Sequence, residues 1–338
     1  MEVKYIIVIG SSAGGIKAIG KLIGKLSPNL PVAVFVVVHM STKSQAEVIR
    51  RQFQQSTRYE CFVATDGMPI TAGKIYIGPA DLHLFVKPGK TRLTQGPHEN
   101  RWRPSIDVLF RSAAAAYGSQ VIGIILSGLM DDGTSGMSAI KRSGGICIVQ
   151  EPSEAEFDDM PLNVLNNVSV DYRALIDDMG YIIDDIFAKP AKSKQPIPED
   201  VKIEAAITER MASSIDDLEK IGTHSNFTCP DCGGGLWKIK NESFSRYRCH
   251  TGHVYTESAL VEKQTEALEE SLWISVRILE ERRNLFLNIA GRDRIQVSDQ
   301  EPAAAYRQRA EQLSVHIERL KGLLVSISKT GPADEGYL

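Results

Sequence analysis

The sequence has no strong excess of either charge, since 39 lysines and arginines stand against 42 aspartates and glutamates in 338 residues. Its net charge of −3 gives no global basic field for nucleic acid or anionic lipid, so binding of either would have to be local. It also lacks an apolar run of about 18 residues and a charged secretory leader. We therefore expect a soluble cytoplasmic protein with no direct membrane insertion.

Cysteine is scarce as well. The chain has five cysteines, an odd number, and three of them gather between residues 229 and 249. This distribution argues against a disulfide scaffold and favours reduced thiols or a bound metal ion.

Residues 1–185 alternate between apolar runs and segments with helical periodicity, as in an α/β domain. Nearly continuous apolar runs are typical of parallel strands that are covered on both faces. The runs are Val3–Ile9, Val32–Val38, Val121–Leu126 and Ile146–Val149, and the helical segments are 16–26, 43–53 and 105–117. The sequence thus predicts a doubly wound, mainly parallel sheet, with an antiparallel hairpin inserted within residues 74–96.

The composition changes after this domain. A Pro- and Lys-rich stretch begins near residue 188 and predicts a linker over 188–225, after a catalytic domain at 1–187. A small zinc-ribbon-like module is expected at 226–256. Two segments with helical periodicity, separated by the polar stretch from Gly291 to Pro302, predict a helical hairpin at 257–330.

The first apolar run ends in Gly10-Ser11-Ser12-Ala13-Gly14. This loop fits neither the phosphate-binding P-loop nor the dinucleotide fingerprint. It does fit the G-x-S-x-G elbow, in which a turn between strand and helix exposes a nucleophilic serine, here Ser12. The alternative is an ordinary turn whose serine caps the next helix.

The other apolar runs end in residues that could assist such a serine. His39 follows the second run, and Asp131 and Asp132 follow the third. Because functional crevices lie at the carboxyl ends of parallel strands, a nucleophile, a base and a carboxylate are expected at one edge of the sheet. The order Ser, His, Asp differs from that of α/β-hydrolases. The alternatives are a hydrogen-bonding rim histidine and an Asp-Asp-Gly turn.

Several motifs in this region resemble the catalytic domain of the chemotaxis protein-glutamate methylesterases. They are spread over about residues 3–170 and read VIGSSAGGIKAI, VVVHMS, IYIGPADLHL, RPSIDVLFRSAA, GIILSGLMDDGTSGMSAI and DDMPLNVL. The resemblance implies Ser12 as nucleophile, His39 as general base and Asp132 as the orienting acid. The backbone N–H groups of Ala13 and Leu129 are the candidates for an oxyanion hole.

The implied reaction is hydrolysis of glutamate γ-methyl esters on a chemoreceptor or related signalling protein, with glutamine deamidation as a second activity. It needs no cofactor. The chain resembles a stand-alone form without a receiver domain, so a separate response regulator would have to supply any phosphorylation switch. Two alternatives remain open, a non-catalytic adaptor with an esterase-like fold and an esterase for small molecules.

The late cysteines have the spacing of a metal site. Cys229 and Cys232 form a C-x₂-C pair, and Cys249 and His253 follow a stretch that alternates like a hairpin. Four such ligands suit tetrahedral zinc, and we expect a structural ion. His250 competes for the fourth position, but beside Cys249 on a strand it would point away, which favours His253.

The same module contains basic residues interleaved with aromatic ones, including Arg246, Tyr247 and Arg248. This mixture could form a small nucleic-acid surface. The favoured interpretation is that the metal site stabilises a domain too small to bury a core. Nucleic acid is therefore not expected as a partner.

Overall fold

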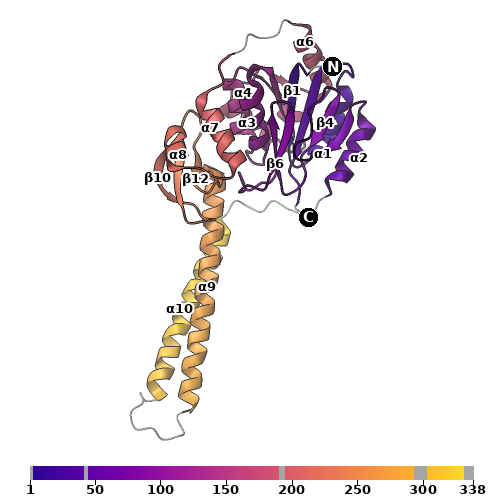
Figure 1. Cartoon of the computed structure of the whole chain (residues 1–338). Coiled ribbons are helices and arrows are strands. Elements are labelled where there is room, and N and C mark those ends of the chain that lie inside the picture. The colour runs from indigo at the N-terminus through magenta and orange to yellow at the C-terminus, as the bar shows by residue number, and fades with distance from the viewer. Residues whose placement is uncertain (1–2, 42–44, 190–194, 293–302, 331–338) are drawn as a thin grey trace. The chain divides into compact units, whose positions relative to one another are not determined.

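The computed structural model describes residues 3–41, 45–189, 195–292 and 303–330 (Figure 1). The chain divides into two compact units, Met1–Glu257 and Ser258–Leu338. Parts of three expected features lie outside the described residues: the start of the helix at 43–53, positions 190–194 of the linker, and most of the polar stretch before Ala303.

A seven-stranded parallel sheet forms the centre of the first unit, with strand order β3-β4-β2-β1-β7-β8-β9. The four apolar runs supply its central strands β1, β2, β7 and β8, every residue of which is buried, as the absence of polar alternation predicts. The strands are β1 (Tyr5–Ser11), β2 (Val32–Val38), β3 (Glu60–Val63), β4 (Lys74–Ile77), β7 (Val121–Ile125), β8 (Ile146–Gln150) and β9 (Tyr172–Ala174).

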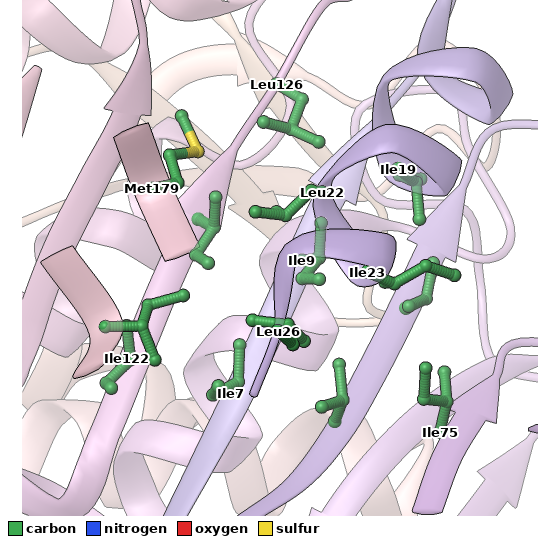
Figure 2. Close-up of a cluster of buried hydrophobic side chains, with 14 of the residues drawn as sticks. Ile7, Ile9, Ile19, Leu22, Ile23, Leu26, Ile75, Ile122, Leu126 and Met179 are labelled. Atoms are coloured by element: carbon green, nitrogen blue, oxygen red, sulfur yellow. The ribbon is translucent and has the colours of Figure 1, made fainter. Parts of the chain in front are cut away.

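Helices cover both faces of this sheet, which confirms the predicted doubly wound α/β fold (Figure 1). One face packs against α1 (Gly15–Lys25), α2 (Ala46–Ser56) and α6 (Ile176–Ala188), and the other against α3 (Ile106–Tyr117), α4 (Thr134–Arg142) and α5 (Asp159–Asn167). Successive residues of a strand point to opposite faces, so Ile7 and Ile9 lie against Leu22 and Ile23 of α1 (Figure 2).

The expected hairpin is shorter than the sequence indicates. Its strands are β5 (His83–Lys87) and β6 (Lys90–Thr94), which pair antiparallel. The first part of the predicted stretch is instead β4, which joins the main sheet between β3 and β2. Three apolar or aromatic residues before a Gly-Pro break fit either type of strand, and burial between two parallel neighbours decides for the main sheet.

Residues 188–225, expected as a linker, contain two helices and the start of a strand. Helix α7 (Glu199–Arg210) begins after Pro198 with two acidic residues in its first turn, a favourable helix start, and α8 (Ile215–Ile221) follows it. Val201 of α7 packs into the core beside the parallel sheet, and Ile207 packs with Leu218 and Trp237. This helix therefore joins the two parts of the first unit rather than separating them.

A second, antiparallel sheet completes the unit, and we call it the C-terminal sheet. Its strands lie in the order β10 (Gly222–Thr228), β11 (Gly235–Ile239), β12 (Arg246–Cys249) and β13 (Val254–Thr256). The β11–β12 pair is the hairpin expected between the two halves of the cysteine motif.

The second unit contains α10 (Ala303–Thr330) and nearly all of α9 (Glu257–Arg292), which form the predicted helical hairpin. Val276 of α9 packs with Ile317 and Leu324 of α10, and Lys321 pairs with Glu280. Among the described residues, none of the helices combines the length and apolarity needed to cross a bilayer.

Candidate active site and metal centre

The carboxyl ends of β1, β2 and β7 meet where the strand order reverses, because the chain runs outward from β1 to β2 and later returns to place β7 on the other side of β1. Such a switch point opens a crevice in parallel sheets. Ser12 directly follows β1, His39 follows β2, and Asp132 lies in the loop between β7 and α4. The structure therefore brings the three predicted residues to one place.

The two adjacent serines have different environments. Ser11 is fully buried and its hydroxyl donates to the Ser127 carbonyl at 2.5 Å, which ties β1 to the loop after β7. Ser12 is partly exposed, and its Oγ lies 3.1 Å from Nδ1 of His39. Of the two serines, only Ser12 is partly exposed and has its hydroxyl beside a base.

His39 bridges Ser12 and Asp132. Its Nε2 lies 2.8 Å from Oδ2 of Asp132, and the side chains of both residues are only 1% exposed. A carboxylate at Nε2 favours the tautomer with the proton on that nitrogen, which leaves Nδ1 free to accept the proton of Ser12. This is the arrangement that general-base activation of a serine requires.

The amino end of α3 holds the Asp132 carboxylate. Its oxygens accept hydrogen bonds from the backbone amides of Ile106 and Asp107 and from the hydroxyl of Ser105. Burial alone would raise the pKa of Asp132, but the hydrogen bond from His39 and those of this helix terminus lower it below the ordinary value. Asp132 is therefore kept ionised beside the imidazole.

Asn100 links this carboxylate to a second buried one. Its Nδ2 lies 3.1 Å from Oδ1 of Asp132 and 2.8 Å from Oδ2 of Asp107. Burial, followed by the charge of Asp132, raises the pKa of Asp107 well above its usual range. The pKa values of the two neighbouring carboxyls are thus shifted in opposite directions, and Asp132 is the one that carries the charge.

Trp102 stacks on the imidazole of His39, with ring centroids 4.0 Å apart and planes inclined by 10°. Neither Trp102 nor Asn100 was predicted from the sequence. Both lie in the loop before α3, which has no periodic pattern, and the only signal was that this loop directly precedes RPSIDVLFRSAA, one of the recognised motifs.

The two candidate oxyanion donors are near the serine. In the described part of the chain, the amides of Ala13 and Leu129 donate no hydrogen bond to a protein atom. Leu129 follows Gly128, whose backbone is so close to Ser12 that an added Cβ would lie 2.9 Å from the serine Cβ. Two unused backbone donors beside a nucleophile fit the requirement for an oxyanion hole, and their role remains a prediction.

Four side chains of the C-terminal sheet and its loops form a second cluster, which we call the cysteine cluster. The ligand atoms of Cys229, Cys232, Cys249 and His253 all lie within 4.8 Å of one another and could hold a metal ion. His250, the competing candidate, is not part of it. The hydrogen bond from Cys249, and then those from His253 and Tyr255, lower the pKa of the Cys229 thiol, while the bond to Cys229 raises the pKa of Cys249.

The distances within the cysteine cluster fit zinc. With Zn–S near 2.3 Å and Zn–N near 2.0 Å, tetrahedral geometry separates two sulfurs by about 3.8 Å and a sulfur from a nitrogen by about 3.5 Å. The sulfurs of Cys232 and Cys249 are 3.7 Å apart, and Nδ1 of His253 lies 3.6 Å from Cys229 and 3.5 Å from Cys249.

The possible nucleic-acid surface is not supported by the positions of its arginines. Arg246 and Arg248 on β12 are 0% and 1% exposed. Arg246 pairs with Glu204 and Glu242, and Arg248 pairs with Glu99. Their charges are neutralised inside the unit and cannot reach a phosphate backbone.

Comparison with known proteins agrees with this geometry. The CheB methylesterase family profile matches residues 7–183. Protein-glutamate methylesterase/protein-glutamine glutaminase 2 of Methanosarcina mazei is 33% identical over 187 residues, 53% of this chain and 51% of that protein. A candidate enzyme of the same description from Leptospira interrogans is 36% identical over 167 residues, 49% of this chain and 86% of that protein. The catalytic domain of Thermotoga maritima CheB methylesterase superposes with a TM-score of 0.52 at 29% identity, covering 54% of this chain and 98% of that domain.

Proposed function

The chain belongs to the CheB methylesterase family, and on that premise we propose that it hydrolyses glutamate γ-methyl esters on a chemoreceptor or related signalling protein. The observation that carries this proposal is the continuous hydrogen-bonded line from Ser12 through His39 to Asp132 at the switch point of the sheet. Deamidation of glutamine side chains is the second activity expected of this site, because an amide carbonyl accepts the same nucleophile.

In the proposed reaction, Ser12 Oγ attacks the ester carbonyl carbon while its proton passes to Nδ1 of His39. Asp132 stabilises the resulting imidazolium through Nε2. The amides of Ala13 and Leu129 bind the negative oxygen of the tetrahedral intermediate. The bond to the methoxy oxygen then breaks, His39 returns its proton, and methanol leaves a γ-glutamyl ester on Ser12.

A water molecule completes the cycle. His39 takes a proton from water, the hydroxide attacks the acyl carbon, and the bond to Ser12 Oγ breaks as the serine regains its proton. The products are the glutamate carboxylate, a proton and methanol, and the serine is free again. The groups of the chain that take part in these steps are the side chains of Ser12, His39 and Asp132 and two backbone amides.

We propose a structural role for the cysteine cluster, with Cys229, Cys232, Cys249 and His253 binding one zinc ion. The bound ion would tie the loop before β11 to the turn between β12 and β13. Because the apolar cluster of the C-terminal sheet is small, a metal ion would add to its stability.

The test of the main proposal is single-turnover methanol release from a receptor fragment that carries labelled glutamate methyl esters. Ser12→Ala should abolish release, while Ser11→Ala, the matched neighbour, should retain it. Turnover of small esters alone would assign the site to small molecules, and receptor binding without any turnover would favour an adaptor. Either result would overturn the proposed substrate.

A further inference from the structure

The C-terminal sheet touches the active site through one short loop, residues 99–102. Val254, the first residue of β13, follows His253 of the cysteine cluster. Glu99 forms a parallel β-bridge with Val254, and the Asn100 amide donates to the Val254 carbonyl at 3.0 Å. One strand end is thus adjacent to a candidate metal ligand and bonded to this loop.

The side chains of the same loop reach the proposed catalytic residues. Asn100 donates to Asp132, and Trp102 lies flat on His39. The loop therefore contacts the acid and the base of the proposed triad at the same time. These contacts fix the position of the Asp132 carboxylate and the plane of the imidazole. Neither Asn100 nor Trp102 has an ionisable side chain that could exchange a proton with substrate.

A buried ionic cluster fastens the loop to the C-terminal sheet. The Glu99 carboxylate is fully buried and accepts hydrogen bonds from Arg248 at 2.9 Å, from Thr208 at 2.9 Å and from Arg111. Arg248 lies on β12, next to Cys249 of the cysteine cluster, and Arg111 lies on α3. Buried charges of this kind hold fixed positions only while every partner is in place, since an unpaired one is strongly destabilising.

The backbone of the loop needs this support. Asn100 and Arg101 have φ angles of 50° and 71°, two successive residues other than glycine in the left-handed region. Each costs on the order of 1 kcal/mol and persists only where surrounding contacts impose it. Two backbone hydrogen bonds between Glu99 and Trp102 close the turn, and Asn100 is held in addition by β13 on one side and Asp132 on the other.

From these contacts we infer that Asn100 and Trp102 are positioning residues for the hydrolytic reaction, and that metal binding by the cysteine cluster keeps them in place. The inference rests on the proposed function of Ser12, His39 and Asp132. Loss of the metal would loosen the turn that leads into β13, and the loop bonded to Val254 would shift with it. Asp132 and His39 would then lose their alignment although both remain in the chain.

The first experiment measures the rate at which Ser12 reacts with a fluorophosphonate, a reagent for activated serines that does not depend on the natural substrate. It compares the zinc-loaded full chain with chelator-treated protein and with Cys232→Ser. We expect a rate reduced at least 10-fold without metal, with the helical circular dichroism retained and the rate of the chelated protein restored by Zn²⁺. Equal rates with and without metal would overturn the inference.

A second readout follows the loop itself. In protein labelled with 5-fluorotryptophan, the ¹⁹F resonance that disappears in Trp102→Phe reports on the stack with His39. Metal removal should shift this resonance and return of Zn²⁺ should restore it. An unchanged resonance would show that the loop does not depend on the metal.

A variant of the zinc-loaded protein covers the case in which metal removal unfolds the whole unit. Asn100→Gly tolerates the positive φ but lacks the side-chain amide that binds Asp132. It should therefore lower kcat about 10-fold with KM and zinc content unchanged. Asn241→Gly is the matched control, an exposed asparagine with a φ of 63° in the turn between β11 and β12, and should leave kcat unchanged. Equal kcat values for Asn100→Gly and wild type would overturn the positioning role.

The proposed function and this inference fail in different ways. If Ser12 of the zinc-loaded wild-type protein does not react with the fluorophosphonate, the proposed nucleophile is wrong and the inference fails with it. If Ser12 reacts equally with and without metal, only the inference fails.

Discussion

The indole of Trp102 lies parallel to the imidazole of His39 at a centroid distance of 4.0 Å. On its edges the same imidazole contacts Ser12 and Asp132. Its position is thus fixed in its own plane by hydrogen bonds and perpendicular to that plane by the indole, which prevents rotation away from the serine.

This stack predicts the effect of replacing the indole. Stacked aromatic pairs contribute about 0.5–1.5 kcal/mol, so Trp102→Ala should lower kcat about 2- to 10-fold with little change in KM. Trp102→Phe should recover most of the loss, because it retains a ring face. Steady-state kinetics of both variants on a methylated receptor fragment test this, and an equal loss in the two variants would contradict a stacking role.

The two aspartates of the loop after β7 should differ sharply. Asp132→Asn removes the charge beside His39 and should lower kcat roughly 1,000- to 10,000-fold, as expected when the imidazole loses its orienting carboxylate. Asp131→Asn is the matched control and should remain within a few-fold of wild type, because the carboxylate bonded to His39 is that of Asp132. Comparable losses in both variants would mean that kcat depends on the conformation of the loop and not on the Asp132 carboxylate.

Substitutions of the two serines of the elbow should affect different properties, stability at Ser11 and activity at Ser12. Ser11→Ala removes a buried hydrogen bond to Ser127 and should lower the free energy of unfolding by about 1 kcal/mol while activity remains. Ser12→Ala should abolish fluorophosphonate labelling with a smaller effect on stability. Denaturant unfolding and labelling on the same preparations test this, and labelling that persists in Ser12→Ala would assign the nucleophile elsewhere.

The close approach of Gly128 to Ser12 offers a test of how tightly the residues around the proposed nucleophile are packed. A Cβ at this position would lie 2.9 Å from the Ser12 Cβ and 2.8 Å from the Met160 terminal methyl, closer than real side chains approach. Gly128→Ala should therefore displace Ser12 or the following Leu129 amide and lower kcat at least 10-fold, an effect of about 1.4 kcal/mol. Wild-type kcat would show that the loop can move without disturbing the oxyanion donors.

How far the sequence predicts this site depends on the element that holds each residue. Ser12, His39 and Asp132 follow strands of a parallel sheet, and the ends of such strands meet at one edge, so their proximity follows from the order of apolar runs. Asn100 and Trp102 lie in a loop whose path is set by contacts with β13, more than 150 positions later. No local pattern carries that information.

The buried arginines illustrate the same limit. From the sequence, Arg246 and Arg248 are predicted to be surface residues, because charged side chains are almost never fully buried unless paired. Arg248 pairs with Glu99, 149 positions away in the sequence. Arg246 pairs with the nearby Glu242 and also with Glu204, which lies on a helix within the segment expected as a linker. A pairing of this kind becomes visible only when the two sheets are packed together.

Glu99 predicts how stability depends on pH. Burial would raise its pKa, but Arg111 and Arg248 lower it to about 2 from an ordinary value of 4.5. Since the folded-state pKa is depressed, the unfolded chain binds more protons between these values, so the contribution of Glu99 is complete above pH 4.5 and is lost as the pH falls to about 2. The two cationic partners of this carboxylate are arginines, which stay charged throughout that range.

Glu99→Gln isolates this contribution. The amide keeps the shape of the side chain but removes one of the two carboxylates, Glu99 and Glu204, that neutralise Arg111 and Arg248. The variant should therefore be less stable than wild type at pH 7 by about 3 kcal/mol. The difference should shrink as the pH falls from 4.5 towards 2, because protonation makes the wild-type side chain equally neutral. Urea unfolding of both proteins across this range measures the difference. A gap that stays constant with pH would mean that Glu99 is not the anion that holds the two arginines, and that the loop is fastened to the C-terminal sheet by its backbone bonds to Val254 alone.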